Sequence, residues 1–245
     1  MAHIHCDFSS ECLKMNTAIH VVLPEKTDLS QVRVIYLFHG LQDNCSGWNR
    51  YTSVERYARE KNAALVIPEV QRSFYTDMAL GVNYFSYVRQ ELPQVCQTLF
   101  GLSARRELNY VMGLSMGGYG ALKCALTDPE RYAACAAFSA VADLPDRVKN
   151  ADTETGLEFQ AIFGPDRVVP EDCDLFALLK QVDPGRAPRI KTYCGESDEL
   201  FESNQRLAKA LRAQGFSNTF EHWQGGHDWI FWDKAVERAI GALLD

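Results

Sequence analysis

One serine in this chain stands in a setting that suits a nucleophile. Ser115 lies in the run GLSMG (113–117), between an apolar stretch and a segment with helical character. This G-x-S-x-G pattern is typical of a sharp turn from strand to helix, which exposes the serine hydroxyl. The following helix points its N-terminus at that hydroxyl, where negative charge develops during attack on a carbonyl. The pattern therefore predicts that Ser115 is a nucleophile for acyl transfer.

A serine hydroxyl needs a neighbouring base, and the chain offers six histidines. His227 lies in the glycine-rich loop GGHD (225–228), between the last predicted strand and the last predicted helix. A loop just past the carboxyl end of a strand is where a base can reach a serine at the same sheet edge. His222 instead falls within the predicted strand 217–223 and is equally well explained as a packed or exposed strand residue. We therefore predict that His227 is the base.

The third member must be a carboxylate that orients the histidine and stabilises its charged form. Asp198 follows the predicted strand 189–194, at the sheet edge that also carries the His227 loop. Asp143, which follows the strand ending near residue 139, is the second candidate, and Glu196 is the third. The shared edge favours Asp198, and both alternatives stay open at this point.

Two backbone N–H groups must also bind the oxyanion that forms during acyl transfer. One should come from Met116, the residue after the nucleophile. The other should come from the loop after the first core strand, where Leu41 is the natural donor. Gly40, just before it, allows the backbone to pass close to the substrate because it has no Cβ.

Aromatic residues on neighbouring loops are candidates for the wall of an acyl or aryl pocket. The candidates are Trp48, Phe74, Tyr75 and Trp229, and we expect Trp48, Tyr75 and Trp229 in the substrate pocket. Ordinary packing is the alternative for each of them. The eight cysteines include no C-x-x-C pair and no spacing typical of a zinc site, so no metal and no other cofactor is expected. Several cysteines, such as Cys124 and Cys135, are expected to serve as small core side chains.

The elements that must position these residues alternate between strand and helix. Apolar runs predict buried strands at 32–38, 63–67, 108–112, 132–138, 189–194 and 217–223. Helix-like segments lie between or after them, at 53–61, 83–100, 116–126, 201–214 and 229–244. This alternation predicts an α/β fold with a mostly parallel central sheet and helices on both faces.

Two further segments complete this fold. Residues 12–23 alternate loosely and are expected to add antiparallel strands at one edge of the sheet. Residues 141–188 are polar and rich in proline, and we expect them to form a small cap-like insertion of short helices. Pro93 should kink the helix 83–100. We expect a single domain over residues 1–245.

Composition narrows the class of protein. Of the 245 residues, 47% are hydrophobic and 23% charged, which leaves ample apolar surface for a core. The net charge of −7 argues against a nucleic-acid partner and against an anionic membrane surface. The start MAHIHCDFSSECLKM has neither the basic end nor the apolar run of a secretory signal, so a cytoplasmic location is expected. The expected partner is a small-molecule or carbohydrate ester, and a homo-oligomer stays open.

Four segments of the chain, taken in order, resemble the esterase D group of hydrolases, which includes the S-formylglutathione hydrolases. They are FHGLQDNCSGWNRYTSVERYA, GLSMGGYGALKCAL, CGESDELFESN and GGHDWIFWD. Within the group the chain is most similar to the tributyrin-esterase-like branch, and the resemblance covers nearly the whole length. It implies an α/β-hydrolase fold, hydrolysis of short-chain acyl esters, and a triad of Ser115, Asp198 and His227. It also implies Leu41 and Met116 as oxyanion donors.

The resemblance further implies a substrate class. Members of this branch are often described as acetyl or feruloyl carbohydrate esterases, so the expected substrate is a sugar acetate or a cinnamoyl ester. The segment FHGLQDNCSGW differs from its leucine- and threonine-rich counterpart in S-formylglutathione hydrolases. A thioesterase of that type, or an acyltransferase with the same triad, is therefore the alternative. A catalytically silent binding protein is expected to lack a triad member, and all three are present.

Overall fold

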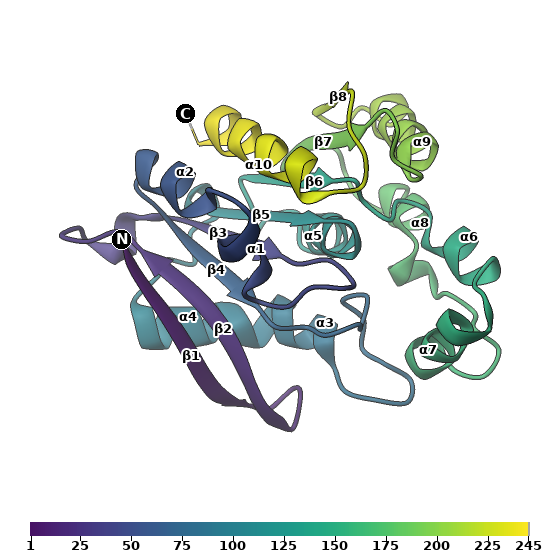
Figure 1. Ribbon diagram of the computed structural model, residues 1–245, viewed down its shortest axis with the longest axis horizontal. Helices are drawn as coiled ribbons and strands as arrows, with labels where there is room; N and C mark the ends of the chain where they lie inside the picture. The colour runs from purple at the N-terminus through teal and green to yellow at the C-terminus, as the bar shows by residue number, and fades with distance from the viewer. Residues whose placement is uncertain (245) are drawn as a thin grey trace.

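The computed structural model describes residues 1–244 and is built on one sheet of eight strands (Figure 1). Their spatial order is β1-β2-β4-β3-β5-β6-β7-β8. The strands are β1 (Ala2–Ser10), β2 (Met15–Leu23), β3 (Arg33–Phe38), β4 (Ala63–Pro68), β5 (Asn109–Leu114), β6 (Ala134–Phe138), β7 (Arg189–Gly195) and β8 (Asn218–Trp223). Strands β3 to β8 run parallel, whereas β1 pairs antiparallel with β2 and β2 antiparallel with β4. The predicted mostly parallel sheet with an antiparallel edge is confirmed.

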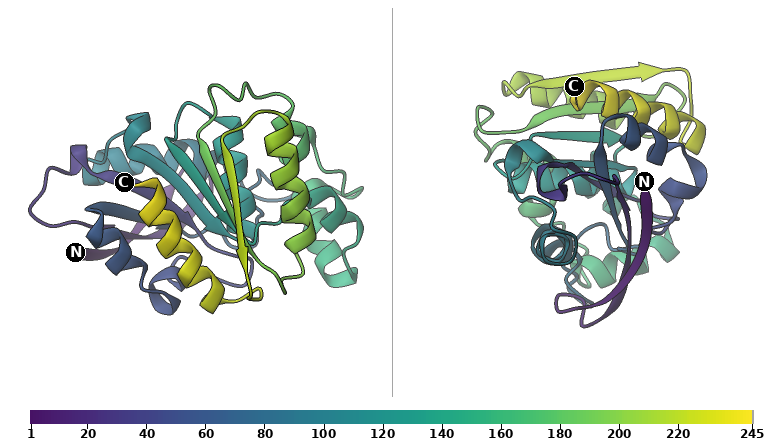
Figure 2. Two further views of the ribbon diagram at one scale, coloured as in Figure 1. Left: turned by 90° about the horizontal axis from the view of Figure 1, so that it is seen from above. Right: turned by 90° about the vertical axis from the view of Figure 1, so that its left-hand side faces the viewer.

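Helices cover both faces of this sheet (Figure 2). One face carries α1 (Gly47–Tyr51), α2 (Val54–Glu60) and α10 (Trp229–Leu243). The other carries α3 (Tyr84–Ser86), α4 (Leu92–Phe100), α5 (Met116–Thr127) and α9 (Phe201–Ala213). No helix within residues 1–244 combines the length and the apolar character that a membrane crossing requires.

The continuous apolar runs of the sequence follow from this layering. In β3, Val34 and Phe38 pack into the core on the α5 side, while Ile35 and Leu37 pack into the core on the α10 side. Successive side chains of a strand point to opposite faces, so a strand covered on both faces needs apolar residues at every position. Cys124 and Cys135 are buried in the same core, as predicted.

The helix predicted over 83–100 forms, but with a defect. It consists of α3, a π-helical turn at Tyr87–Glu91, and α4. Pro93 has no N–H to donate to the carbonyl of Arg89, and the guanidinium of Arg131 donates to that carbonyl instead. A wide turn thus lies directly before Pro93, and the bend predicted there stays a prediction.

Strands β1 and β2 form a hairpin at one edge of the sheet, which we call the edge hairpin. The side chain of Glu91 in the wide turn binds this hairpin to the rest of the protein. Its carboxylate accepts hydrogen bonds from the Ser10 hydroxyl at 2.5 Å and from the N–H groups of Glu11 at 2.6 Å and Cys12 at 3.2 Å. Burial alone would raise the pKa of Glu91, but these bonds lower it below its ordinary value. The turn between β1 and β2 is therefore held by an ionised carboxylate.

The segment 141–188 leaves the end of β6 and returns at the start of β7 as three short helices, the last of which packs against α5 and α9 (Figure 1). They are α6 (Leu144–Lys149), α7 (Thr153–Phe163) and α8 (Leu175–Leu179). Aspartates begin all three, since Asp143, Asp152 and Asp174 each accept a hydrogen bond from an N–H of the first turn. The predicted insertion of short helices is thus present.

Candidate active site

Ser115 occupies a strained turn between β5 and α5. Its φ is 52° and its ψ is −116°, in a region that residues with a side chain seldom adopt. A Cβ on Gly113 would lie 2.3 Å from the carbonyl oxygen of Gly117, and one on Gly117 would lie 2.4 Å from that of Phe38. Both flanking positions therefore require glycine, because the turn packs backbone directly against backbone.

The structure brings Ser115, His227 and Asp198 into one chain of hydrogen bonds. The Nε2 of His227 lies 3.0 Å from the Oγ of Ser115, and its Nδ1 lies 2.9 Å from the Oδ2 of Asp198. The three residues follow β5, β8 and β7, whose carboxyl ends lie at the same edge of the sheet. This is the order in which a nucleophile, its base and an orienting carboxylate must stand.

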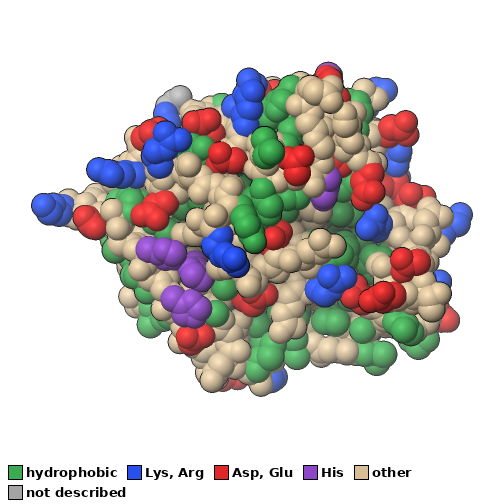
Figure 3. Space-filling view, in the orientation of Figure 1, with side chains coloured by type: hydrophobic (Ala, Val, Ile, Leu, Met, Phe, Trp, Pro, Cys, Tyr) green, Lys and Arg blue, Asp and Glu red, His purple; other side chains and the backbone are tan. Residues whose placement is uncertain are grey.

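The other candidates for the acid and the base have their partners outside this chain of hydrogen bonds. Asp143 caps α6 and binds the guanidinium of Arg206 at 2.8 Å. Glu196 lies 2.8 Å from the Nδ1 of His222, on the exposed surface. The histidines of the edge hairpin, His3, His5 and His20, hydrogen-bond to one another over β1 and β2, where Figure 3 shows a group of histidine side chains.

The carboxylate of Asp198 is held in a buried, fully bonded setting. Burial alone would raise its pKa, but hydrogen bonds from His227, Ser139 and the N–H of Leu200 lower it below its ordinary value. The Leu200 N–H donates to Oδ1 at 2.8 Å, and the indole N–H of Trp232 donates to the Ser139 hydroxyl at 3.2 Å. Asp198 therefore stays ionised and fixed in place at neutral pH.

Sequence reasoning did not single out Ser139 and Trp232. Both are buried, and the ring of Trp232 also packs edge-on against His227, with centroids 4.9 Å apart. The available signals were their positions, Ser139 directly after β6 and Trp232 in the first turns of α10. Neither signal separates a positioning role from ordinary packing.

The two expected oxyanion donors flank the nucleophile. Met116 begins α5, and the first N–H groups of a helix have no acceptor within it. A Cβ on Gly40 would lie 2.6 Å from the Cδ1 of Leu114 and 3.6 Å from the Cβ of Ser115. The loop that carries Leu41 therefore passes directly beside the serine. Both Leu41 and Met116 line the same cavity as Ser115.

A half-buried carboxylate and a buried phenol fix the loop around Leu41. Glu69 accepts hydrogen bonds from the N–H groups of Cys45 at 3.0 Å and Gln71 at 2.8 Å, and it lies 3.5 Å from His39. Burial by itself would raise the pKa of Glu69, but His39 and these two N–H groups lower it. The hydroxyl of Tyr75 donates to the carbonyl of His39 at 3.0 Å. The position of Leu41 is thus set by neighbours outside the cavity.

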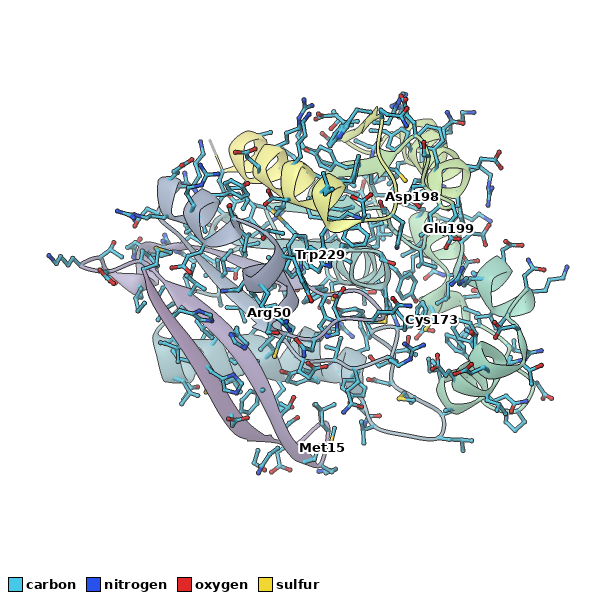
Figure 4. All side chains as sticks on the ribbon, viewed as in Figure 1. Met15, Arg50, Cys173, Asp198, Glu199 and Trp229 are labelled. Atoms are coloured by element: carbon cyan, nitrogen blue, oxygen red, sulfur yellow. The ribbon has the colours of Figure 1, made fainter. Side chains whose placement is uncertain are left out.

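The cavity beside Ser115, which we call the catalytic pocket, has a volume of about 380 Å³. Its apolar wall is formed by side chains from the core layers on both faces of the sheet. They are Leu41, Phe74, Leu114, Val141, Trp229 and Trp232. Figure 4 places Trp229 at the start of α10 and Asp198 and Glu199 after the end of β7. Of the three aromatic residues expected in the pocket, Trp229 lines it.

Trp48 and Tyr75 do not line the catalytic pocket, in contrast to the prediction. Both are fully buried behind its wall. The indole N–H of Trp48 donates to the carbonyl of Phe38 at 3.0 Å, and its ring supports Trp229 edge-on at 5.3 Å between centroids. The ring of Tyr75 stacks on Phe38 at 4.7 Å. The sequence places these aromatic residues near the site but does not distinguish a wall from its support.

Comparisons with known proteins agree with this geometry. The model of the Esterase family matches residues 10–243. The chain is 30% identical over 259 residues to an acetyl esterase from Caldicellulosiruptor saccharolyticus, with 98% of this chain and 97% of the relative covered. Both proteins are therefore matched over almost their full lengths.

Two solved structures from Staphylococcus aureus also match. The fluorophosphonate-binding serine hydrolase F has a TM-score of 0.90 at 30% identity, over 100% of this chain and 98% of the other. The S-formylglutathione hydrolase FrmB has a TM-score of 0.89 at 31% identity, over 100% and 99%. The fold is accordingly the α/β-hydrolase fold, as the resemblance implied. By its family match, its relatives and its fold, the chain belongs to the Esterase family and is a carboxylic ester hydrolase of the serine hydrolase type.

Proposed function

We propose that the chain hydrolyses short-chain acyl esters by two-step acyl transfer, with Ser115 as nucleophile, His227 as base and Asp198 as the orienting carboxylate. The observation that carries this proposal is the hydrogen-bonded chain from Asp198 through His227 to Ser115, at 2.9 and 3.0 Å, beside an apolar pocket of about 380 Å³. No cofactor enters the proposed reaction.

In the first step the Oγ of Ser115 attacks the ester carbonyl while the Nε2 of His227 takes its proton. The N–H groups of Leu41 and Met116 hold the negative oxygen of the tetrahedral intermediate. When the intermediate collapses, His227 returns the proton to the leaving alcohol, and the acyl group stays on Ser115. In the second step a water molecule repeats the sequence and releases the acid.

Asp198 acts on this cycle through the imidazole. An ionised carboxylate at 2.9 Å from Nδ1 keeps the proton of the neutral ring on that nitrogen, so that Nε2 is free to accept one. The same charge stabilises the imidazolium that forms after attack. The lowered pKa of Asp198 means that it retains this charge and does not itself take the proton.

The size and apolar wall of the catalytic pocket favour a small acyl group, of which acetyl is the simplest. The acetyl esterase relative supports this choice, and acetyl esters of carbohydrates are the natural substrates that we propose, with the larger feruloyl esters as the other member of this substrate class. A thioesterase of the S-formylglutathione hydrolase type, or an acyltransferase, is the second candidate. It is favoured by the likeness to the staphylococcal S-formylglutathione hydrolase.

A hydrolysis panel tests the proposal. Wild type and Ser115→Ala would be given p-nitrophenyl acetate, butyrate and octanoate, methyl ferulate, acetylated xylo-oligosaccharide and S-formylglutathione. We expect cleavage of the short esters by wild type and a loss of several orders of magnitude in the variant. Activity that survives Ser115→Ala contradicts the assignment of the nucleophile. Faster turnover of S-formylglutathione than of every oxygen ester would favour the second candidate.

A further inference from the structure

A second cavity of about 460 Å³ opens beside the catalytic pocket. We call it the side cavity, and its walls come from α6, the start of α7 and the start of α9. The two hollows share wall residues, namely Val141, Arg147, Glu199 and Leu200. A molecule that is bound at Ser115 and extends past these shared residues therefore enters the side cavity.

The two hollows differ in chemistry. More than half of the wall of the catalytic pocket is apolar, although it also carries Asp43 and Asp228, whereas the wall of the side cavity is largely charged and polar. The carboxylates of the side cavity are Asp143, Asp146, Asp152, Glu199 and Glu202. Its cations are Arg147 and Arg206, so five negative groups face two positive ones and three negative charges remain uncompensated. Figure 3 shows acidic side chains over the part of the surface where α6 and α7 lie.

Each arginine of the side cavity already has a carboxylate partner. Arg206 lies 2.8 Å from Asp143, and Arg147 lies 3.6 Å from Glu199. Among residues 1–244, Asp146, Asp152 and Glu202 take part in no ion pair, so the field inside the cavity is negative. A ligand with a carboxylate of its own would therefore meet repulsion here.

The pair of Arg147 and Glu199 stands at the boundary between the two hollows. Their side chains are 43% and 70% exposed, and exposed ion pairs at such a distance contribute little to stability. The pair can therefore separate at small cost and offer its guanidinium N–H groups and carboxylate oxygens to a ligand. Hydroxyl groups suit both partners, because a hydroxyl donates to a carboxylate and accepts from a guanidinium.

We propose that the side cavity holds the leaving-group half of the ester, and that its acidic wall selects neutral, hydroxyl-bearing alcohols over anionic leaving groups. The proposal rests on the proposed function, since it assigns the two halves of one substrate to two hollows around Ser115. The acyl half occupies the apolar catalytic pocket. The alcohol half lies beyond Arg147 and Glu199, where hydroxyls find both donors and acceptors and a carboxylate meets an excess of negative charge.

A series of acetates that differ only in the alcohol measures this selectivity. Glycerol monoacetate is neutral and bears hydroxyls, butyl acetate is neutral and apolar, and 4-acetoxybutanoate is anionic. Acid release at constant pH follows all three with one readout, and p-nitrophenyl acetate reports whether the esterase is active at all. We expect kcat/KM to be highest for glycerol monoacetate and at least about tenfold lower for 4-acetoxybutanoate at low salt. Added salt should narrow this gap, because it screens the charges of the cavity.

Charge-neutralising variants connect the selectivity to this cavity. Asp146→Asn combined with Glu202→Gln removes two of the uncompensated charges and adds no bulk. We expect the ratio of kcat/KM for 4-acetoxybutanoate to that for butyl acetate to rise about fivefold. Asp166→Asn combined with Glu171→Gln makes the same charge change within residues 141–188 but outside both hollows, and it should leave the ratio as in wild type.

The outcomes separate this proposal from the proposed function. If p-nitrophenyl acetate is not cleaved, the proposed function fails. If it is cleaved but the anionic acetate is turned over as fast as the neutral ones, the side cavity does not select by charge and the inference is wrong. The inference also fails if none of the aliphatic acetates is cleaved, or if the control pair changes the ratio as much as the test pair does.

Discussion

The hydroxyl of Ser139 connects the core to the candidate triad, and its removal gives a sharp test of how Asp198 is held. Ser139→Ala takes away one hydrogen bond to the Asp198 carboxylate and the acceptor of the Trp232 indole N–H. Ser139 is fully buried and has a φ of 46°, a strained value that serine and alanine bear about equally. The backbone should therefore stay where it is, and the change acts through the lost hydrogen bonds.

Two separate losses are expected. The buried indole N–H of Trp232 is left without a partner, which costs about 2 kcal/mol of stability and about 4–8 °C in Tm for a chain of this size. A hydrogen bond to a charged acceptor is worth about 1.5–3 kcal/mol, which bounds the loss in kcat at about 10- to 150-fold. Part of that bond is also lost in the ground state, so we expect kcat to fall about tenfold. KM for p-nitrophenyl acetate should not change, because Ser139 does not line the catalytic pocket.

A double variant separates these two losses. Trp232→Phe removes the indole N–H, so Ser139→Ala together with Trp232→Phe leaves no orphaned N–H group, and only the weak thiol donor of Cys194 loses its acceptor. We expect the double variant to recover stability relative to Ser139→Ala alone without recovering kcat. Thermal unfolding and steady-state kinetics on the three variants measure both quantities. Full kcat in Ser139→Ala would refute the argument, since Ser139 would then be only a core residue.

Three further predictions concern the acid, the strained turn around Ser115 and the edge hairpin. Asp198→Asn should lower kcat by about 10⁴-fold, whereas Asp143→Asn should lower it by less than about tenfold, and the reverse order would make Asp143 the acid. Gly117→Ala should cost about 3 kcal/mol or more in urea unfolding, because its Cβ would meet the Phe38 carbonyl at 2.4 Å, while Gly241→Ala, with open space around it, should cost nothing. Glu91→Gln should cost about 2 kcal/mol at pH 7. Because the folded-state pKa of Glu91 is lowered, its contribution is present above the ordinary pKa and is lost as pH falls, so the difference from wild type should shrink below about pH 4. An equal difference at pH 7 and pH 3 would contradict an ionised Glu91.

Most of the layout of the sheet could be read from the chain, because a strand covered on both faces must be apolar at every position. The elements that escaped prediction are those that lack this pattern. Strand β1 (Ala2–Ser10) is the outer edge of the sheet, and its polar and half-exposed side chains carry no apolar run. Helix α1 (Gly47–Tyr51) has five residues, fewer than helical periodicity needs to show itself.

The candidate site likewise contains residues that could be predicted from the sequence and residues that could not. Ser115 and His227 stand in glycine-rich local patterns that backbone geometry imposes, and such patterns are visible along the chain. Ser139, which acts on Asp198, and Trp232, which donates to Ser139, are brought in from distant parts of the sequence. Their roles depend on which side chains meet in space. No local pattern encodes such meetings.

The path of residues 141–188 has a consequence for how this enzyme can change over generations. The segment begins and ends at strands of the sheet and builds much of the side cavity, while the hydrogen-bonded chain to Ser115 is anchored on β5, β7 and the start of α10. Substitutions within α6 and α7, apart from Arg147 at the boundary, can therefore reshape the side cavity without displacing the reactive groups. Under the two proposals made above, the chemistry and the preference for the alcohol are thus carried by different stretches of one gene.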